Sequence, residues 1–189
     1  MKIIFVATLF LVFVCCPVSI GLSQDKYELS NVKVKLVKTG SIGDITKYKN
    51  FDLGRSEMEG CKGFEELAIK LLEGKGFKNV EHNAAQISFV YTFFSKVIDD
   101  STVPWMKEDC QKGDMVLYIV LVAHDKETVA TGYKDADARS WGAEARATVM
   151  PPLPSPTLDN EKEEGKILIA LYKKLLVQLI DKCIPEKKK

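Results

Sequence analysis

Histidine is scarce in this sequence, and the residue patterns of the common enzyme classes are missing. The 189 residues include two histidines, His82 and His124, and neither has a cysteine or carboxylate at the spacing of a known metal-binding motif. There is no G-x-S-x-G nucleophile elbow, no H-E-x-x-H motif and no phosphate-binding loop. The sequence therefore predicts a protein that is not an enzyme, without catalytic residues, cofactor or metal. Both histidines are interpreted as exposed residues in turns.

An excess of charge of either sign is also missing. The 27 lysines and arginines nearly balance the 26 aspartates and glutamates, which gives a net charge of +1. Proteins that bind nucleic acid through its phosphates usually present a strongly basic surface, so we expect no nucleic-acid partner. Asn-x-Ser/Thr triplets do not occur either, and nothing in the chain points to a glycosylated eukaryotic ectodomain.

The most continuous apolar run stands at the N-terminus and predicts a secretory signal peptide. Ile3–Val14 is almost entirely apolar, follows Met1-Lys2 and is ended by Pro17. It has the length of a signal-peptide hydrophobic region, about 7–15 residues, and is shorter than the roughly 20 residues that a spanning helix needs. We predict a signal peptide at residues 1–23, or at 1–21 in a second cleavage frame, and export to the periplasm or cell envelope of a bacterium.

Two alternatives to simple cleavage stay open. Cys15 or Cys16 could become the lipidated first residue of a bacterial lipoprotein, which would tether the domain to a membrane, although Val14 and Pro17 are unfavourable flanking residues. An uncleaved leader that acts as a membrane anchor is the other alternative. Simple cleavage after residue 23 removes one lysine and no acidic residue, so the 27 basic residues become 26, equal to the 26 acidic ones.

Three cysteines remain once the predicted leader is removed, and an odd number leaves one thiol unpaired or none paired. Cys61 and Cys110 stand in loop-like stretches near glycines and are the candidate pair for a disulfide. Cys183 ends a helical pattern and is a candidate buried thiol. A chain without any disulfide is the alternative.

The apolar periodicity of residues 24–189 predicts a single α+β domain. Five segments read as strands: 32–37, 48–53, 85–94, 115–123 and 139–150. The strand at 115–123 is almost continuously apolar, as expected for burial on both faces. Amphipathic stripes predict one helix that begins after Gly63 and ends at Gly74, and another over 166–183. We expect a mixed or antiparallel sheet of about five strands, both helices on one face, and a proline-rich connector at 151–156.

A long polar connection, Ser95–Gly113, separates the two most apolar strands. Connections of this length are usually functional or disordered. Phe93 and Phe94 border it and Trp105 lies within it, so these three aromatic residues are the candidate partner-binding residues. Packing of the same three residues in the core is the alternative.

Several short segments resemble a family of exported bacterial proteins known as domain of unknown function 4136. The shared features are a tyrosine-lysine-aromatic strand, a helix that ends in lysine-glycine-aromatic, and a following strand that contains a valine and a tyrosine. Here they are Tyr48, Lys49, Phe51, Lys75, Gly76, Phe77, Val90 and Tyr91. The chain departs from the family at Ala85 and Gln86, where an acidic residue is usual. The resemblance implies a cell-envelope α+β domain, usually lipid-anchored, of unassigned activity, and it implies no catalytic residue.

These observations favour an exported binding or scaffold domain of the cell envelope that contacts a protein partner or an envelope component. A carrier that holds a small hydrophobic ligand between the sheet and the C-terminal helix is the second hypothesis. A hydrolase that uses His82 or His124 is the least favoured. Oligomeric state, and the identity of partner or ligand, are left open by the sequence.

The predicted leader is tested by the intact mass of the full-length protein expressed in a bacterial host. We expect the mass of residues 24–189 without added lipid, because Pro17 and the small residues after it suit simple cleavage. A mass that corresponds to a chain beginning at Cys15 or Cys16 with attached acyl chains would contradict this prediction. Alkylation of the unreduced protein in denaturant counts the free thiols in the same experiment.

Overall fold

The computed structural model describes residues 26–54, 63–132, 140–154, 159 and 161–187. The predicted signal peptide at 1–23, including Cys15 and Cys16, lies outside the described residues, as does Cys61. Within the described part, no helix is both long enough and apolar enough to cross a membrane.

Six strands form one mixed sheet, which confirms the predicted α+β fold and adds a strand to the expected five. In spatial order the strands are β1 (Glu28–Lys38), β6 (Ser140–Met150), β5 (Met115–Asp125), β4 (Ile87–Val97), β2 (Asn50–Leu53) and β3 (Lys78–Asn79). The first four in this order pair antiparallel, whereas β4–β2 and β2–β3 are parallel pairs. The additional strand, β3, has two residues, too few to show an alternating pattern.

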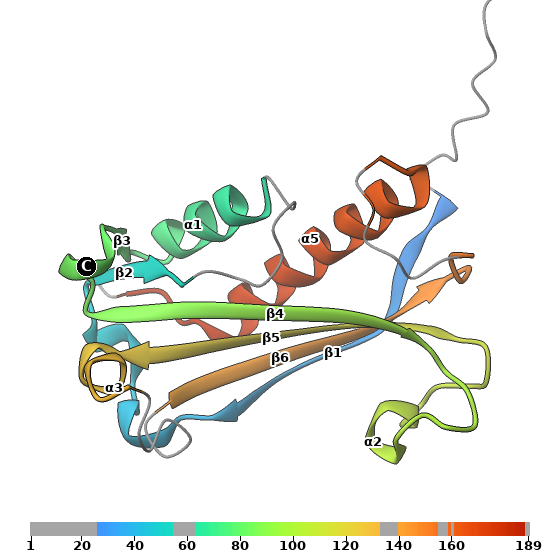
Figure 1. The fold of residues 1–189 in the computed structure, drawn as a ribbon, viewed down its shortest axis with the longest axis horizontal. Coiled ribbons are helices and arrows are strands. Elements are labelled where there is room, and N and C mark those ends of the chain that lie inside the picture. The colour runs from blue at the N-terminus through green and yellow to red at the C-terminus, as the bar shows by residue number, and fades with distance from the viewer. Residues whose placement is uncertain (1–25, 55–62, 133–139, 155–158, 160, 188–189) are drawn as a thin grey trace, which may run out of the picture.

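Two long helices lie on the same face of this sheet, as predicted (Figure 1). They are α1 (Phe64–Gly74) and α5 (Glu163–Cys183). Two short helices follow β4 and β5 in the chain, α2 (Pro104–Lys107) and α3 (Lys126–Ala130), and they lie toward opposite ends of the sheet (Figure 1).

The hydrophobic core lies between the two long helices and the sheet, because alternate residues of each strand point to this face. On β6 these residues are mostly alanines, whose small side chains allow α5 to approach the backbone of the sheet. From the helix side, α1 buries every fourth residue of one stripe, and α5 buries a wider stripe. The main contributors are Trp141, Ala143, Ala145 and Ala147 of β6, Phe64, Ala68 and Leu72 of α1, and Leu168, Leu171, Tyr172, Leu175 and Leu179 of α5.

The connection between β4 and β5 is shorter than the sequence indicates, because the β-hairpin ladder continues to the pair Val97–Met115. His124, interpreted as a turn residue, instead lies within β5 and is half-buried, so that interpretation was wrong. The strand β5 extends beyond the apolar segment 115–123 from which it was predicted, because its backbone pairing with β4 and β6 continues past Ala123. Burial lowers the pKa of the His124 imidazole.

The described part of the proline-rich connector, residues 151–154, forms neither helix nor strand and begins with a cis peptide bond between Met150 and Pro151. Leu153 is buried in the core between the sheet and the helices. The remainder of the predicted connector lies outside the described residues.

Gly165, in the first turn of α5, packs against the backbone of Asp159, and a substitution there tests this contact. A Cβ atom at Gly165 would overlap the backbone of Asp159, so we expect Gly165→Ala to lower the free energy of unfolding by about 1–3 kcal/mol. Gly74, also helical, has no atom within 4 Å of the equivalent Cβ position. Gly74→Ala is therefore the matched control, and we expect it to be neutral or to stabilise by at most about 1 kcal/mol. Urea unfolding of both variants measures this; equal effects would contradict the packing.

Candidate functional site

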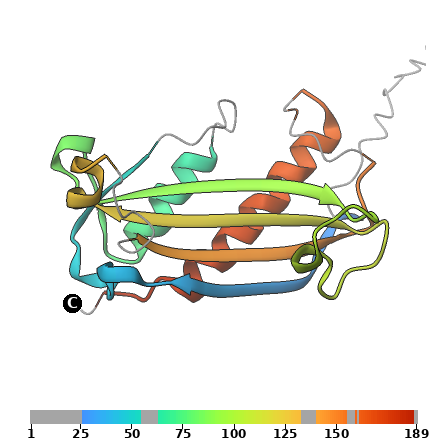
Figure 2. The ribbon, with the colours of Figure 1, turned by 60° about the horizontal axis from the view of Figure 1, so that its bottom comes forward.

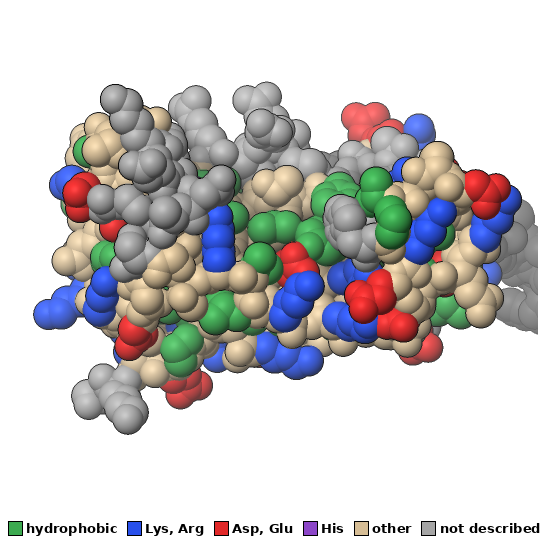
Figure 3. Space-filling model, turned by 90° about the horizontal axis from the view of Figure 1, so that it is seen from below, with side chains coloured by type: hydrophobic (Ala, Val, Ile, Leu, Met, Phe, Trp, Pro, Cys, Tyr) green, Lys and Arg blue, Asp and Glu red, His purple; other side chains and the backbone are tan. Residues whose placement is uncertain are grey.

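The sheet face opposite α1 and α5 carries the candidate functional site (Figure 2). We call it the open face, and hydrophobic side chains are visible across it, with lysine, arginine and acidic side chains among them (Figure 3). The strand register brings side chains of β1, β6, β5 and β4 next to one another on this face. The open face is defined here by Val90, Thr92 and Phe94 of β4, Tyr118, Val120 and Val122 of β5, Glu144 and Arg146 of β6, and Lys33 and Lys35 of β1.

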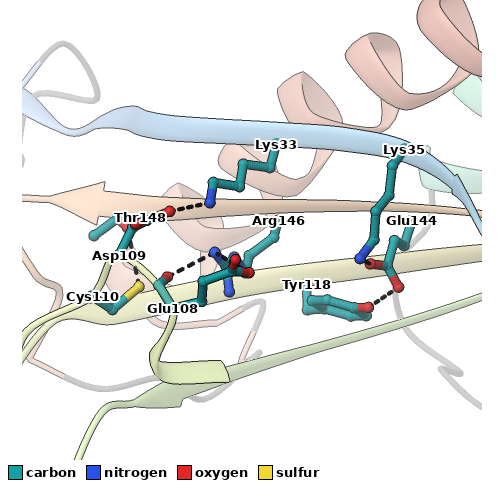
Figure 4. A network of polar contacts seen from close by, with 9 residues as sticks. All are labelled: Lys33, Lys35, Glu108, Asp109, Cys110, Tyr118, Glu144, Arg146 and Thr148. Atoms are coloured by element: carbon teal, nitrogen blue, oxygen red, sulfur yellow. Dashed lines mark hydrogen bonds and ion pairs between the residues drawn. The ribbon is translucent and has the colours of Figure 1, made fainter. Parts of the chain in front are cut away.

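Glu144 connects three strands of the open face through its two carboxylate oxygens (Figure 4). Lys35 Nζ of β1 lies 2.8 Å from Oε1, and the phenol of Tyr118 on β5 donates a hydrogen bond to Oε2. The hydrogen bond to Glu144 raises the pKa of Lys35. Burial, together with the bond to Glu144, raises the pKa of Tyr118, so its phenol stays protonated and remains a donor.

Arg146 and Lys33 hold the segment that follows α2 against the sheet. The Arg146 side chain is 10% exposed, and its Nη2 donates a hydrogen bond of 2.7 Å to the backbone carbonyl of Glu108. Lys33 pairs with Asp109 and lowers the pKa of that carboxyl group. Ion pairs at exposed positions contribute little, about 0–1 kcal/mol, so the buried guanidinium is the stronger tether.

A cavity of about 100 Å³ lies where these charged groups meet. Its lining contains three cations and two carboxylates, together with the phenol of Tyr118. An arginine and two lysines face it, and Asp109, outside the lining, pairs with Lys33, so the positive and negative charges around the cavity balance. The lining residues are Lys33, Lys35, Glu108, Tyr118, Glu144 and Arg146.

The three aromatic residues predicted to bind a partner do not share one surface. Phe94 is half-buried on the open face, where its ring stacks on Tyr118 with centroids 4.9 Å apart. Phe93 points to the opposite face, is 5% exposed and packs against Phe64 and Tyr172, so it belongs to the core and not to a contact surface. Consecutive strand residues point to opposite faces, and so only one of the two phenylalanines can reach a partner. Trp105 lies in α2, and its side chain is outside the description.

The predicted disulfide between Cys61 and Cys110 stays a prediction, because Cys61 is not described. Cys110 has a free thiol in the structure, half-buried in the connection that packs on the open face, with Sγ 3.9 Å from Thr148 Oγ1. Cys183 is also a free thiol, half-buried against the core. Burial raises the pKa of the Cys183 thiol and makes it a poorer nucleophile.

Sequence reasoning missed most of the open face as a site. Lys33 and Lys35 were visible as the polar side of an alternating strand, as were Glu144 and Arg146 of another. The two strands are neighbours in the sheet but lie more than a hundred residues apart in the chain, so no local pattern indicates that they pair. The signal available was the alternation itself, which placed each pair on one face of its own strand.

The tether of the α2 segment can be tested with Arg146→Ala. We expect amide exchange at Cys110, whose N–H donates to the Lys107 carbonyl, to accelerate about tenfold or more, because a hydrogen bond from a charged group contributes about 1.5–3 kcal/mol. Lys35→Ala removes the same charge from the same face but leaves this segment held, so it is the control. Similar exchange in both variants would contradict a specific role for Arg146.

Comparisons with known proteins do not assign the chain to a family. No protein-family model matches the sequence, and no curated protein matches it. A PelC dodecamer from Paraburkholderia phytofirmans is similar in structure with a TM-score of 0.43 and 9% identity, over 84% of this chain and 99% of that one. A PDZ domain protein from Parabacteroides distasonis has a TM-score of 0.37 and 12% identity, over 81% of this chain and 36% of that one. Likeness of this degree carries no argument about function.

Proposed function

We propose that this chain is an exported, non-catalytic binding domain of a bacterial cell envelope, and that it contacts a protein partner through the open face. The observation that supports this most is a sheet face that α1 and α5 leave uncovered, with hydrophobic and aromatic side chains beside fixed charged groups. Export rests on the leader predicted at residues 1–23, which the intact-mass measurement tests.

The composition of the open face suits a protein interface. Protein contact surfaces are enriched in aromatic side chains, and the open face presents the half-buried ring of Phe94, which stacks on the buried ring of Tyr118. Tyr118 and Arg146 are buried and held by their partners, and a surface built on side chains that are ordered in advance loses less conformational entropy on binding. The valines between these residues would provide the apolar contact.

An acidic residue on the partner would complete the fit. Lys35, at the cavity beside Tyr118, is 69% exposed, so it can exchange its bond to Glu144 for one to an incoming carboxylate. We therefore expect the partner to present an acidic side chain within an apolar surface.

The carrier hypothesis has less support. It needs an apolar cavity beneath α5, but the side chains of α5 that face the sheet are buried and pack within a single core together with Phe93 and Trp141. A ligand bound there would have to displace side chains such as Leu171 or Leu175, whose burial stabilises the fold.

Site-specific photocrosslinking in cells tests the proposal. A photoreactive amino acid at Thr92, exposed in the middle of the open face, should give one crosslinked protein of defined mass in the envelope fraction. The same group at Lys174, exposed on α5, is the control and should give none.

Competition sharpens this experiment. Excess unlabelled wild-type protein should reduce the adduct at least tenfold in envelope extracts, whereas unlabelled Thr92→Arg protein, with a bulky charge on the open face, should not. Thr92 is exposed, so this substitution leaves the core intact, and circular dichroism verifies folding. Equal adducts from Thr92 and Lys174, or equal competition by the two proteins, would overturn the proposal.

A further inference from the structure

A second cavity, of about 200 Å³, lies at the end of the sheet where β2, the start of β4 and α3 meet. Its apolar lining includes Ile87 and Val129. Its polar lining includes Asp52 of β2, His82 of the short 3-10 helix His82–Ala84, and Lys126 of α3. The α2 segment that Arg146 tethers lies toward the opposite end of the sheet, so this cavity is separate from the charged cavity on the open face (Figure 1).

Asp52 has one carboxylate oxygen satisfied and one unsatisfied. Its side chain is 8% exposed, and Oδ2 lies 2.5 Å from Nδ1 of His82. The other oxygen, Oδ1, is buried and has no hydrogen-bond partner among the described residues. Buried polar groups are nearly always hydrogen-bonded in folded proteins, so an unsatisfied oxygen on a residue that lines a cavity indicates a donor that those residues do not supply.

The neighbouring polar groups leave this oxygen for a ligand. Lys126 Nζ is held at 3.1 Å by the backbone carbonyl of Asn83. His82, 64% exposed, engages only Oδ2 and lies on the solvent side of the pair. Ser88, opposite Asp52 in the parallel pairing of β2 and β4, adds a buried hydroxyl to the same lining.

We propose that this cavity binds a small primary ammonium compound with a short apolar body, whose N–H groups donate to Asp52 Oδ1 and to the Ser88 hydroxyl. The ammonium group supplies three donors and a positive charge, which suits a buried carboxylate. Ile87 and Val129 pack against its apolar part. The described residues contain no group of three or more histidine, cysteine or acidic side chains that could hold a metal, which favours an organic cation over a metal ion.

Titration of the full processed protein with n-butylammonium chloride, followed by amide NMR shifts, tests this proposal. We expect saturable shifts at His82, Ser88 and Val129, with sodium butyrate producing none. Asp52→Asn, which keeps the shape of the side chain, should weaken binding at least tenfold, while Asp44→Asn, at an exposed carboxylate on another turn, should leave it unchanged.

A second variant keeps the test decisive if Asp52→Asn fails to fold. Val129 is a half-buried residue of α3 that lines the cavity, and the larger side chain of Val129→Phe would fill part of it without changing the Asp52 carboxylate. This variant should also abolish the saturable shifts. Three results would overturn the proposal: no saturable shift with butylammonium, equal affinity in wild type and Val129→Phe, or equal binding of butyrate. Displacement of butylammonium by Zn²⁺ at equimolar protein would reassign the site to a metal and would also overturn it.

Discussion

The packing of α5 across the long antiparallel strands is the interaction on which the rest of this structure depends. Leu168, Leu171, Tyr172 and Leu175 are all buried against the sheet, and each large apolar side chain contributes about 1.5–3 kcal/mol when fully removed from water. The alanines of β6 are what allow a helix to lie this close. Once α5 and α1 occupy one face, the alternation of strand residues commits every second residue of the sheet to the other.

The second face is where the two candidate sites arise, and short segments between strands shape both. The connection that contains α2 folds back at one end of the sheet, where Arg146 holds it, and it covers Val116 together with part of Phe94. At the other end, α3 and the 3-10 helix at 82–84 enclose the cavity beside Asp52. In the middle of the face, Thr92 is exposed and Val120 is half-buried.

Much of the fold is predictable from local patterns, because helices and strands differ in the period of their apolar residues. The stripe of α1 and the wider stripe of α5 were both predicted, and both helices lie on the face expected. The strand β5 is less simple than its continuous apolar run indicates. Its residues toward the helices are fully buried, whereas on the other face Val116 is buried beneath the α2 connection and Val122 is partly exposed.

The candidate sites were predictable only in fragments. Phe93 and Phe94 were predicted together as contact residues, but Phe93 is buried in the core, because the register of β4 decides which of the two faces the helices. His82 was noted as an exposed histidine, but its pairing with Asp52, 30 residues earlier, has no local signature. In the sequence, Tyr118 is one of several apolar residues of its strand, and only the structure shows that its phenol donates a hydrogen bond to Glu144.

The amino-acid sequence by itself determined the types of the elements, the apolar sides of the two long helices and the alternation of each strand, because these depend on residues within a few positions of one another. The tertiary structure alone decided which polar side chains meet. Lys35 reaches Glu144 through strand order and register, which are set by the packing of the whole sheet beneath α5. Asp52 reaches His82 because the 3-10 helix at 82–84 lies against β2.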